Sequence, residues 1–349
     1  MKALTIKRML LLLVILTGCS DSNENPGNDP MDDDLAGPIS RPTSGYGADG
    51  INQVEEVNFP NPLYDGTEVS IFYPSKITSG KPTVFFSHPY GGENKNFNKG
   101  LFEFIAKKGF VVVFVPYPTL SVSIEDRYNT LWAGFTKAAK DYPNLIDTTR
   151  VGFMGHSFGG GASIGLAYKA FTENGWGKSG RFLFTMAPWY SFQITPEQLA
   201  NFPTNTQMIT QVYDQDVVND SRMAIDIFKS ISIEANEKDF VYIRSSTVDG
   251  YTYLTDHVLP NTRSAYDALD YYGIYRLLDA LMDYSFNHNA AARDVALGNG
   301  SVAQITMPSY NGKAMAPLEV TDAPSPQYQQ GKYEFRCDSI INPRIDRCN

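Results

Sequence analysis

Short apolar runs recur along the chain from about Val54 onward and alternate with segments of helical spacing. The runs are nearly continuous and rich in β-branched and aromatic residues, which is typical of strands buried on both faces. They cover Val69–Tyr73, Thr83–Ser87, Val111–Val115, Val151–Met154, Phe182–Met186, Met208–Tyr213 and Phe240–Ile243.

Helical spacing of apolar residues lies between these runs. It covers Lys99–Lys108, Leu131–Tyr142, Gly160–Phe171 and Ser221–Ser230. A longer helix is predicted over Thr262–Ser285, with Thr262 as its N-cap. Because strand and helix alternate, we predict an α/β fold with a mostly parallel central sheet and helices on both faces.

The same pattern predicts where the domain begins and ends. We assign residues 51–290 to one α/β domain. Residues 291–349 are rich in Gly, Pro and Asn, and we expect them to form a C-terminal extension packed on that domain. Only sixteen residues separate Trp189 from Thr206, so we expect no helical lid domain there.

The N-terminal residues have the pattern of an export signal. A positively charged start precedes the apolar run Met9–Leu16, which is too short to span a bilayer. The string L-T-G-C at positions 16–19 resembles the bacterial lipoprotein signal, in which cleavage precedes a cysteine that is then acylated. We predict a signal peptide over residues 1–18, lipid such as palmitate on Cys19, and export to the outer membrane or cell surface. The alternative is an ordinary signal peptide with a chance cysteine.

Composition changes this picture in two places. Residues 19–50 are rich in Asp, Asn, Pro, Gly and Ser, with almost no large apolar side chains, so we predict a disordered tether. The formal net charge is −9, from 38 acidic and 29 basic residues, and the basic residues are scattered. No basic stripe exists to neutralise phosphates, which excludes nucleic acid as a partner.

Three cysteines are present in the chain, at positions 19, 337 and 348. If Cys19 carries lipid, Cys337 and Cys348 remain, and an exported protein meets an oxidising compartment, so we predict a disulfide between them. Such a bond would stabilise the fold by about 3 kcal/mol. The alternatives are free thiols or metal ligands, but two cysteines without a nearby histidine make a poor zinc site. No metal or organic cofactor is predicted.

The string G-H-S-F-G at 155–159 directly follows a predicted strand and precedes a predicted helix. This is the context of a nucleophile elbow, a sharp turn that lifts a serine hydroxyl above the sheet. Side chains at 155 and 159 would collide in such a turn, which explains the glycines. We predict that Ser157 is a catalytic nucleophile.

A serine hydroxyl needs a base to remove its proton, and the chain has four histidines. His88 precedes the elbow, and His156 is adjacent to Ser157 and is expected to point elsewhere. His288 lies in N-H-N beyond the long predicted helix, which is typical of a surface position. His257 follows the last predicted strand by a loop and fits the chain order serine, acid, histidine, so we predict that it is the base.

The acid is expected just after the strand Met208–Tyr213, where D-Q-D-V-V offers Asp214 and Asp216. In related hydrolases an apolar residue commonly stands two positions after the acid, as Val218 does for Asp216. This favours Asp216, with Asp214 as the alternative and Asp249 as a more distant one. The acid would hold the imidazole in the useful tautomer and stabilise its cation.

An oxyanion needs two backbone N–H donors in this kind of site. One is predicted to be the N–H of Phe158, the residue after the nucleophile. The other is expected from the loop P-Y-G-G at 89–92, where proline has no N–H and Tyr90 or Gly91 must donate. The alternative is that this loop is only a glycine turn.

With these motifs in place, the chain resembles the cutinase-like polyester hydrolases over roughly residues 55–260. G-H-S-F-G-G-G at 155–161 is similar to their G-x-S-M-G-G-G elbow. A-P-W at 187–189 looks like their substrate-clamping tryptophan segment, and D-H-V-L-P-N at 256–261 is similar to their histidine loop. Tyr90 corresponds to their oxyanion-loop tyrosine, and their C-terminal disulfide has a counterpart in the last two cysteines.

The resemblance implies an α/β-hydrolase fold and cleavage of carboxylic esters, with Trp189 and Tyr90 in contact with substrate. A monomer with an open groove for a lipid-like or polymeric ester is expected. The chain departs from the family at Phe158, in the loop H-P-Y-G-G, and in its longer C-terminal part. The alternatives are an acyltransferase or thioesterase with the same triad, or a surface-binding lipoprotein without catalysis. Trp189 could equally be a core residue.

Overall fold

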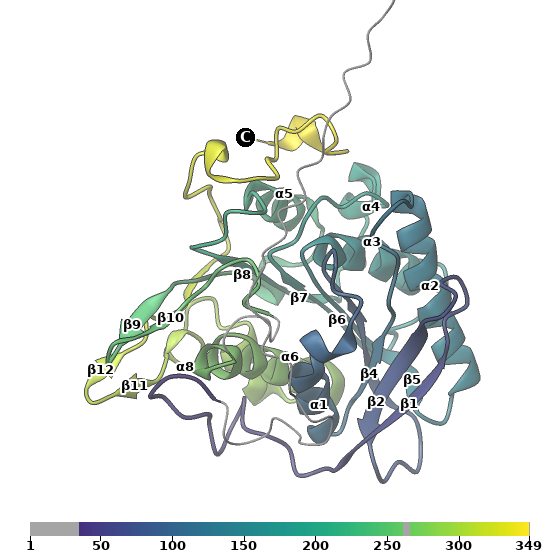
Figure 1. Ribbon diagram of the computed structural model, residues 1–349, viewed down its shortest axis with the longest axis horizontal. Coiled ribbons are helices and arrows are strands. Elements are labelled where there is room, and N and C mark those ends of the chain that lie inside the picture. Colours follow the sequence, from purple (N-terminus) through teal and green to yellow (C-terminus); the bar gives the residue numbers. More distant parts are fainter. Residues whose placement is uncertain (1–34, 261–265, 349) are drawn as a thin grey trace, which may run out of the picture. The chain divides into compact units, whose positions relative to one another are not determined.

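A nine-stranded sheet forms the centre of the computed structural model, which describes residues 35–260 and 266–348 (Figure 1). The strand order is β1-β2-β4-β3-β5-β6-β7-β8-β13. The strands β4, β3, β5, β6, β7 and β8 run parallel, whereas β1, β2 and β13 join the sheet through antiparallel pairs. The strands are β1 (Val54–Pro60), β2 (Glu68–Pro74), β3 (Lys81–Ser87), β4 (Val111–Phe114), β5 (Ile146–His156), β6 (Gly180–Met186), β7 (Gln207–Tyr213), β8 (Lys238–Ile243) and β13 (Glu319–Thr321).

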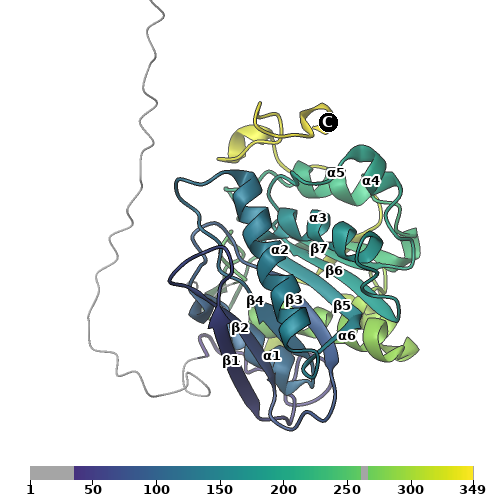
Figure 2. The same ribbon diagram turned by 90° about the vertical axis from the view of Figure 1, so that its right-hand side faces the viewer.

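Helices cover both faces of the sheet (Figure 2). They are α1 (Lys99–Lys107), α2 (Ile124–Asp141), α3 (Phe158–Thr172), α4 (Pro196–Ala200), α5 (Arg222–Ser230), α6 (Arg276–Asn287), α7 (Arg293–Ala296) and α8 (Val302–Ile305). Val84 and Phe86 of β3 pack with α1 and α6, whereas Phe85 between them packs with α2 and α3. Because successive strand residues point to opposite faces, both faces of β3 are buried, as its unbroken apolar run predicted. The predicted α/β fold with a mostly parallel sheet is confirmed.

Two helices differ from the sequence prediction at their first residues. Helix α2 begins at Ile124 and not at Leu131, because Ser123 and Asp126 form a reciprocal capping box with a 3.0 Å bond from Asp126 N to Ser123 Oγ. The long C-terminal helix begins with a π-helical stretch, Asp270–Tyr275, and continues as α6. Its predicted cap, Thr262, lies outside the described residues.

Residues 35–50 belong to the compact unit that runs from residue 35 onward. Ile39 is 4% exposed, and its N–H donates to Tyr253 Oη at 3.0 Å. Gly47 N donates to Asp279 Oδ2 at 3.0 Å. The predicted tether is therefore wrong for residues 35–50, because a few apolar side chains and backbone hydrogen bonds dock a segment whose composition is polar. Residues 19–34, like the predicted signal peptide and Cys19, lie outside the described part of the chain.

The C-terminal extension adds to the sheet as well as packing on it. Strand β13 pairs antiparallel with β8 at the sheet edge, from Glu319 opposite Tyr242 to Thr321 opposite Phe240. The predicted disulfide between Cys337 and Cys348 is present, with the two Cα atoms 5.5 Å apart. Within residues 35–260 and 266–348, no helix is both long and apolar enough to cross a membrane.

Candidate active site

Ser157 lies on a strained turn between the end of β5 and the start of α3. Its backbone has φ 54° and ψ −120°, a left-handed region that costs free energy for a residue other than glycine. A Cβ at position 155 would lie 2.3 Å from the Gly159 oxygen, and one at 159 would lie 1.9 Å from the Ser87 oxygen. Both flanking positions therefore require glycine, as the sequence analysis argued.

The structure brings Ser157, His257 and Asp216 together although they are distant in sequence. His257 Nε2 is 3.0 Å from Ser157 Oγ, and His257 Nδ1 is 2.8 Å from Asp216 Oδ2. An ionised carboxylate can only accept, so Nδ1 carries the hydrogen and Nε2 is left to accept from the serine hydroxyl. Ser157 is 7% exposed and Asp216 is 4% exposed, so most water is excluded from these contacts.

The two candidate acids, Asp214 and Asp216, make different contacts. Asp216 Oδ1 accepts from the N–H of Val218 at 2.7 Å and from the N–H of Asn219 at 3.2 Å, which leaves Oδ2 for the imidazole. Asp214 accepts instead from Ser245 N at 3.0 Å and from the hydroxyl groups of Ser245 and Thr255. Burial opposes ionisation of Asp214, but these hydrogen bonds outweigh it and lower the pKa of its carboxyl. The third candidate, Asp249, lies in the turn between β9 (Ser246–Val248) and β10 (Tyr251–Tyr253).

His156 contacts the candidate base, contrary to the expectation that it points elsewhere. Its ring centroid lies 4.9 Å from that of His257. Burial, with a smaller contribution from the charge of His257, holds the pKa of His156 well below its usual range, so this ring is neutral. The sequence shows only that His156 is adjacent to the serine. His156, the last residue of β5, and the loop that carries His257 meet only in the folded protein.

His88 holds the loop that follows β3. Its Nδ1 is 2.6 Å from the Pro89 oxygen, its Nε2 accepts from Tyr117 N at 3.0 Å, and its ring stacks on Tyr117 at 3.8 Å. Burial lowers the pKa of His88 to about 3, although the Pro89 carbonyl favours the protonated form. His288 ends α6 in a left-handed conformation and is exposed, as the sequence predicted.

The predicted oxyanion loop forms a tight turn after β3. Gly92 N donates to the Pro89 oxygen at 2.9 Å, and Gly91 has φ +72°, as the third residue of a type II turn requires. Tyr90 occupies the second position and is 51% exposed. The Arg127 guanidinium lies 5.2 Å from the Tyr90 ring and 5.3 Å from the Phe158 ring. One cation therefore makes cation–π contacts with the rings of both residues whose backbone N–H groups are the predicted oxyanion donors.

Trp189 lies beside the elbow and is half-buried. Its backbone N–H donates to the backbone oxygen of Ser157 at 2.8 Å, so its backbone is fixed to the candidate nucleophile. Its indole is surrounded by four aromatic rings at centroid distances of 4.6–5.8 Å, those of Phe158, Tyr190, Phe192 and Phe335. The indole therefore has a packing role, and Phe335 brings the C-terminal extension to the site.

The sequence did not indicate one residue that contacts the candidate nucleophile. Asn219 Nδ2 donates to Ser157 Oγ at 3.2 Å and to the Ala187 oxygen at 2.9 Å. Asn219 is 4% exposed. It follows the candidate acid in D-V-V-N-D, a string that reads as an ordinary loop, and no spacing signal marks it.

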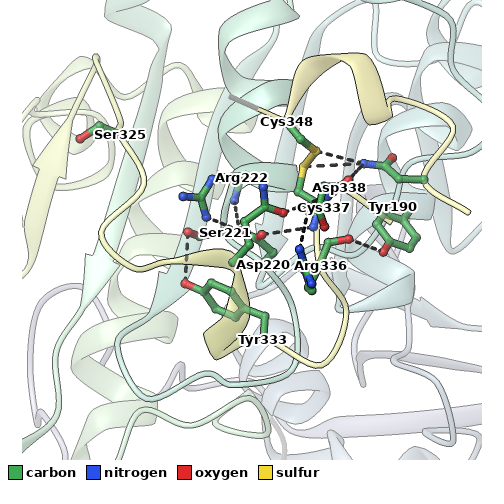
Figure 3. Close-up of polar contacts among 12 residues, drawn as sticks. Tyr190, Asp220, Ser221, Arg222, Ser325, Tyr333, Arg336, Cys337, Asp338 and Cys348 are labelled. Carbon is green, nitrogen blue, oxygen red and sulfur yellow. Dashed lines mark hydrogen bonds and ion pairs between the residues drawn. A yellow bond between two sulfur atoms is a disulfide. The ribbon is translucent and has the colours of Figure 1, made fainter. Parts of the chain in front are cut away.

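The C-terminal residues 333–337 run beside the loop that carries Asp216 and Asn219. Glu334 N donates to the Val217 oxygen and Phe335 N to the Val218 oxygen, both at 2.8 Å, and Asp220 N donates to the Phe335 oxygen at 3.0 Å. Figure 3 shows the side chain of Asp220 between Arg222 and the backbone of Cys337, next to the disulfide. The extension therefore supports the loop of residues 214–220, which we call the acid loop. The sequence indicated no such role for the extension.

Nothing in the described chain gathers metal ligands: within residues 35–260 and 266–348, no three His, Cys, Asp or Glu side chains lie close enough to hold a metal ion. No protein-family model matches the chain, and a search of curated proteins finds no significant match.

Proposed function

We propose that this protein is a serine hydrolase that cleaves carboxylic esters through an acyl-serine intermediate. The observation that carries the proposal is the line of contacts from Ser157 Oγ to His257 Nε2 at 3.0 Å and from His257 Nδ1 to Asp216 Oδ2 at 2.8 Å. These distances lie within the range for hydrogen bonds between a nucleophile, its base and an orienting acid.

The reaction follows from these positions. Ser157 Oγ attacks the ester carbonyl carbon while its proton passes to His257 Nε2, and the carbonyl electron pair moves onto oxygen. Collapse of this intermediate expels the alcohol, which takes the proton from Nε2, and leaves an acyl-serine. Water then attacks by the same route and releases the acid. Asp216 orients the imidazole and stabilises the imidazolium.

The arrangement of the elements supports an α/β-hydrolase assignment. The nucleophile follows β5, the acid follows β7 and the base follows β8, so all three lie at the carboxyl edge of the parallel strands. Their order along the chain is serine, acid, histidine, as in hydrolases of this fold. The first residue of α3, Phe158, contributes an N–H at a helix N-terminus, where such groups lack an intrahelical acceptor. We assign Phe158 N and the Tyr90 turn to the oxyanion.

The proposed substrate is an ester with an apolar or aromatic acyl part, as the resemblance to cutinase-like polyester hydrolases implies. Tyr90 is half exposed and shares the Arg127 guanidinium with Phe158, and Trp189 is half-buried beside the elbow. The stretch between Trp189 and Thr206 holds α4, a helix of five residues, which is too small to form a lid domain.

We further propose export and lipid attachment through Cys19, on the sequence string L-T-G-C alone. Mass spectrometry of the protein from its native membrane is expected to find an N-terminal diacylglyceryl cysteine. Wild-type protein that starts at another residue or stays in the soluble fraction would contradict this proposal.

The test of the enzyme proposal combines a fluorophosphonate probe with p-nitrophenyl esters of increasing acyl length and a solid polyester. We expect the wild type to be labelled and Ser157→Ala to be unlabelled. Either Ser157→Ala or His257→Ala is expected to lower kcat by several orders of magnitude, and the double variant should lose little more, because the pair acts as a unit. Full activity of Ser157→Ala would overturn the proposal. Product analysis with an added alcohol separates hydrolysis from acyl transfer.

A further inference from the structure

We propose that Asn219 is a fourth catalytic residue, whose side-chain amide donates a hydrogen bond to Ser157 Oγ and holds the hydroxyl for proton transfer to His257. The inference rests on the proposed serine chemistry. To that chemistry the inference adds a group that lies outside the triad and that no spacing in the sequence indicates.

The orientation of the Asn219 amide is fixed by its second contact. Nδ2 lies 2.9 Å from the Ala187 oxygen and 3.2 Å from Ser157 Oγ. A backbone carbonyl can only accept, so the NH₂ group and not the amide oxygen must face Ala187. The second hydrogen of the same NH₂ group is then available to Ser157 Oγ.

This hydrogen bond fixes the orientation of the serine hydroxyl. Oγ accepts from Asn219 through one lone pair and donates its own hydrogen to His257 Nε2, 3.0 Å away. The second lone pair is left for attack on the carbonyl carbon. As the Oγ proton moves to Nε2, negative charge grows on Oγ, and a neutral donor at this position stabilises it. Asn219 neither gains nor loses a proton.

The fold holds Asn219 in place from both sides. Its own N–H donates to Asp216 Oδ1 at 3.2 Å, so the acid and the amide belong to one loop. On the other side, Asn219 forms a parallel bridge with Phe335 of the C-terminal extension. Asn219 is 4% exposed, and its Oδ1 is buried without a hydrogen-bond partner among the described residues. The loop and the extension therefore hold the buried amide with its NH₂ group toward Ser157 Oγ.

The test compares Asn219→Ala with a matched variant, Asn61→Ala. Asn61 is also buried, at 5% exposed, and its Nδ2 donates to a backbone oxygen, that of Pro116, at 2.7 Å. We expect fluorophosphonate labelling of Asn219→Ala to be about ten to a hundred times slower than that of the wild type, with a similar fall in kcat. Asn61→Ala is expected to react at the wild-type rate. Melting temperatures of both variants report how much stability each loses.

A second variant, Asn219→Asp, separates chemistry from packing. It keeps the shape of the side chain but replaces the donor with a carboxylate that stabilises protonated His257, so the acid limb of the kcat/KM profile should move to higher pH. An Asn219→Ala variant labelled at the wild-type rate, together with an unmoved profile for Asn219→Asp, would overturn the inference. If the wild type itself is not labelled at Ser157, the proposed function fails first and this inference fails with it.

Discussion

Asp214 and Asp216 are two residues apart, yet their surroundings give them different tasks. Asp216 shares its two oxygens between backbone N–H groups and His257. Asp214 ties the end of β7 to Ser245 and Thr255, residues that lie between β8 and the histidine loop. One carboxylate therefore orients His257, the proposed base, while the other holds together the loops that carry His257 and Asp216.

We expect Asp216→Asn to fold normally and to lower kcat on the order of 10³–10⁴-fold. The asparagine oxygen can still accept from Val218 N, but its NH₂ group would then face His257 Nδ1 and favour the wrong tautomer. Asp214→Asn removes a charged acceptor and is expected to cost about 1–3 kcal/mol of stability with a milder loss of turnover. Steady-state kinetics and urea unfolding of both variants check this. The reverse ranking in kcat would show that Asp214 is the acid.

Trp189 combines a packing role with the proposed contact to substrate. Trp189→Ala removes a half-buried ring that packs against four others, so we expect the free energy of unfolding to fall by at most about 3–5 kcal/mol, the loss at a fully buried aromatic residue. A substrate contact adds a second effect, a fall in kcat/KM for aromatic esters that exceeds the fall for acetate esters by up to about tenfold. Equal losses on all esters would remove Trp189 from the substrate site and leave it as a core residue.

At the scale of elements, the C-terminal extension acts as a brace for the acid loop. Three backbone hydrogen bonds join residues 334–335 to residues 217–220. The extension is fixed in turn by the disulfide and by the pair Arg344–Asp226, whose atoms Nε and Oδ2 are 2.6 Å apart and whose side chains are 4% and 6% exposed. The acid loop lies at the carboxyl end of β7, outside the hydrogen-bonded strands. Its order therefore depends on these contacts with the extension.

We expect the variant Cys337→Ala/Cys348→Ala to lose about 3 kcal/mol of stability and to lose activity at a lower temperature than its secondary structure. The physical reason is that residues 333–337 release the loop carrying Asp216 before the sheet melts. Ile105→Ala in α1, a fully buried site, is the control: it loses about 2–5 kcal/mol but should lose activity and circular dichroism together. Coincident curves for the cysteine variant would contradict the brace.

At the scale of the whole molecule, Asp267 connects segments that are distant in sequence. It forms a bridge with Ala36 near the start of the described chain, and Oδ2 accepts from Tyr251 Oη at 2.9 Å. Burial raises the pKa of Asp267 to about 6, although hydrogen bonds from Leu269 and Tyr251 oppose this. Burial, and then the charge of Asp267, raises the pKa of Asp270 as well.

This raised pKa predicts how stability changes with pH. Between about pH 4 and 6 the native Asp267 carboxyl keeps a proton that the unfolded chain releases, so stability falls as pH rises through about 6. Relative to Asp267→Asn, the wild type should lose about 2–3 kcal/mol between pH 4 and 7. Urea unfolding of both proteins measures it. The buried neutral His88 and His156 act with the opposite sign, but they are common to both proteins and cancel in the difference. A difference that does not change with pH would contradict the prediction.

The sequence by itself determined the elements and the residue types of the site. Seven nearly continuous apolar runs became the strands β2 to β8, because a strand buried on both faces is mostly apolar along its length. The glycines at 155 and 159 identified the elbow, since backbone oxygens lie where their side chains would be. The chain order of serine, acid and histidine then selected His257, and the cysteine count selected the disulfide, because neither argument requires the positions of distant segments in space.

The tertiary structure decided the contacts that depend on which distant segments meet. Nothing near Asn219 in the sequence reveals that it faces Ser157, because that contact needs β5, β7 and the C-terminal extension to be assembled. The sequence also did not predict that residues 35–50 dock on the domain or that β13 pairs with β8. Short polar segments gain their stability from partners elsewhere in the chain. Patterns along the chain report burial, whereas these positions are fixed by hydrogen bonds between residues 32 to 214 positions apart.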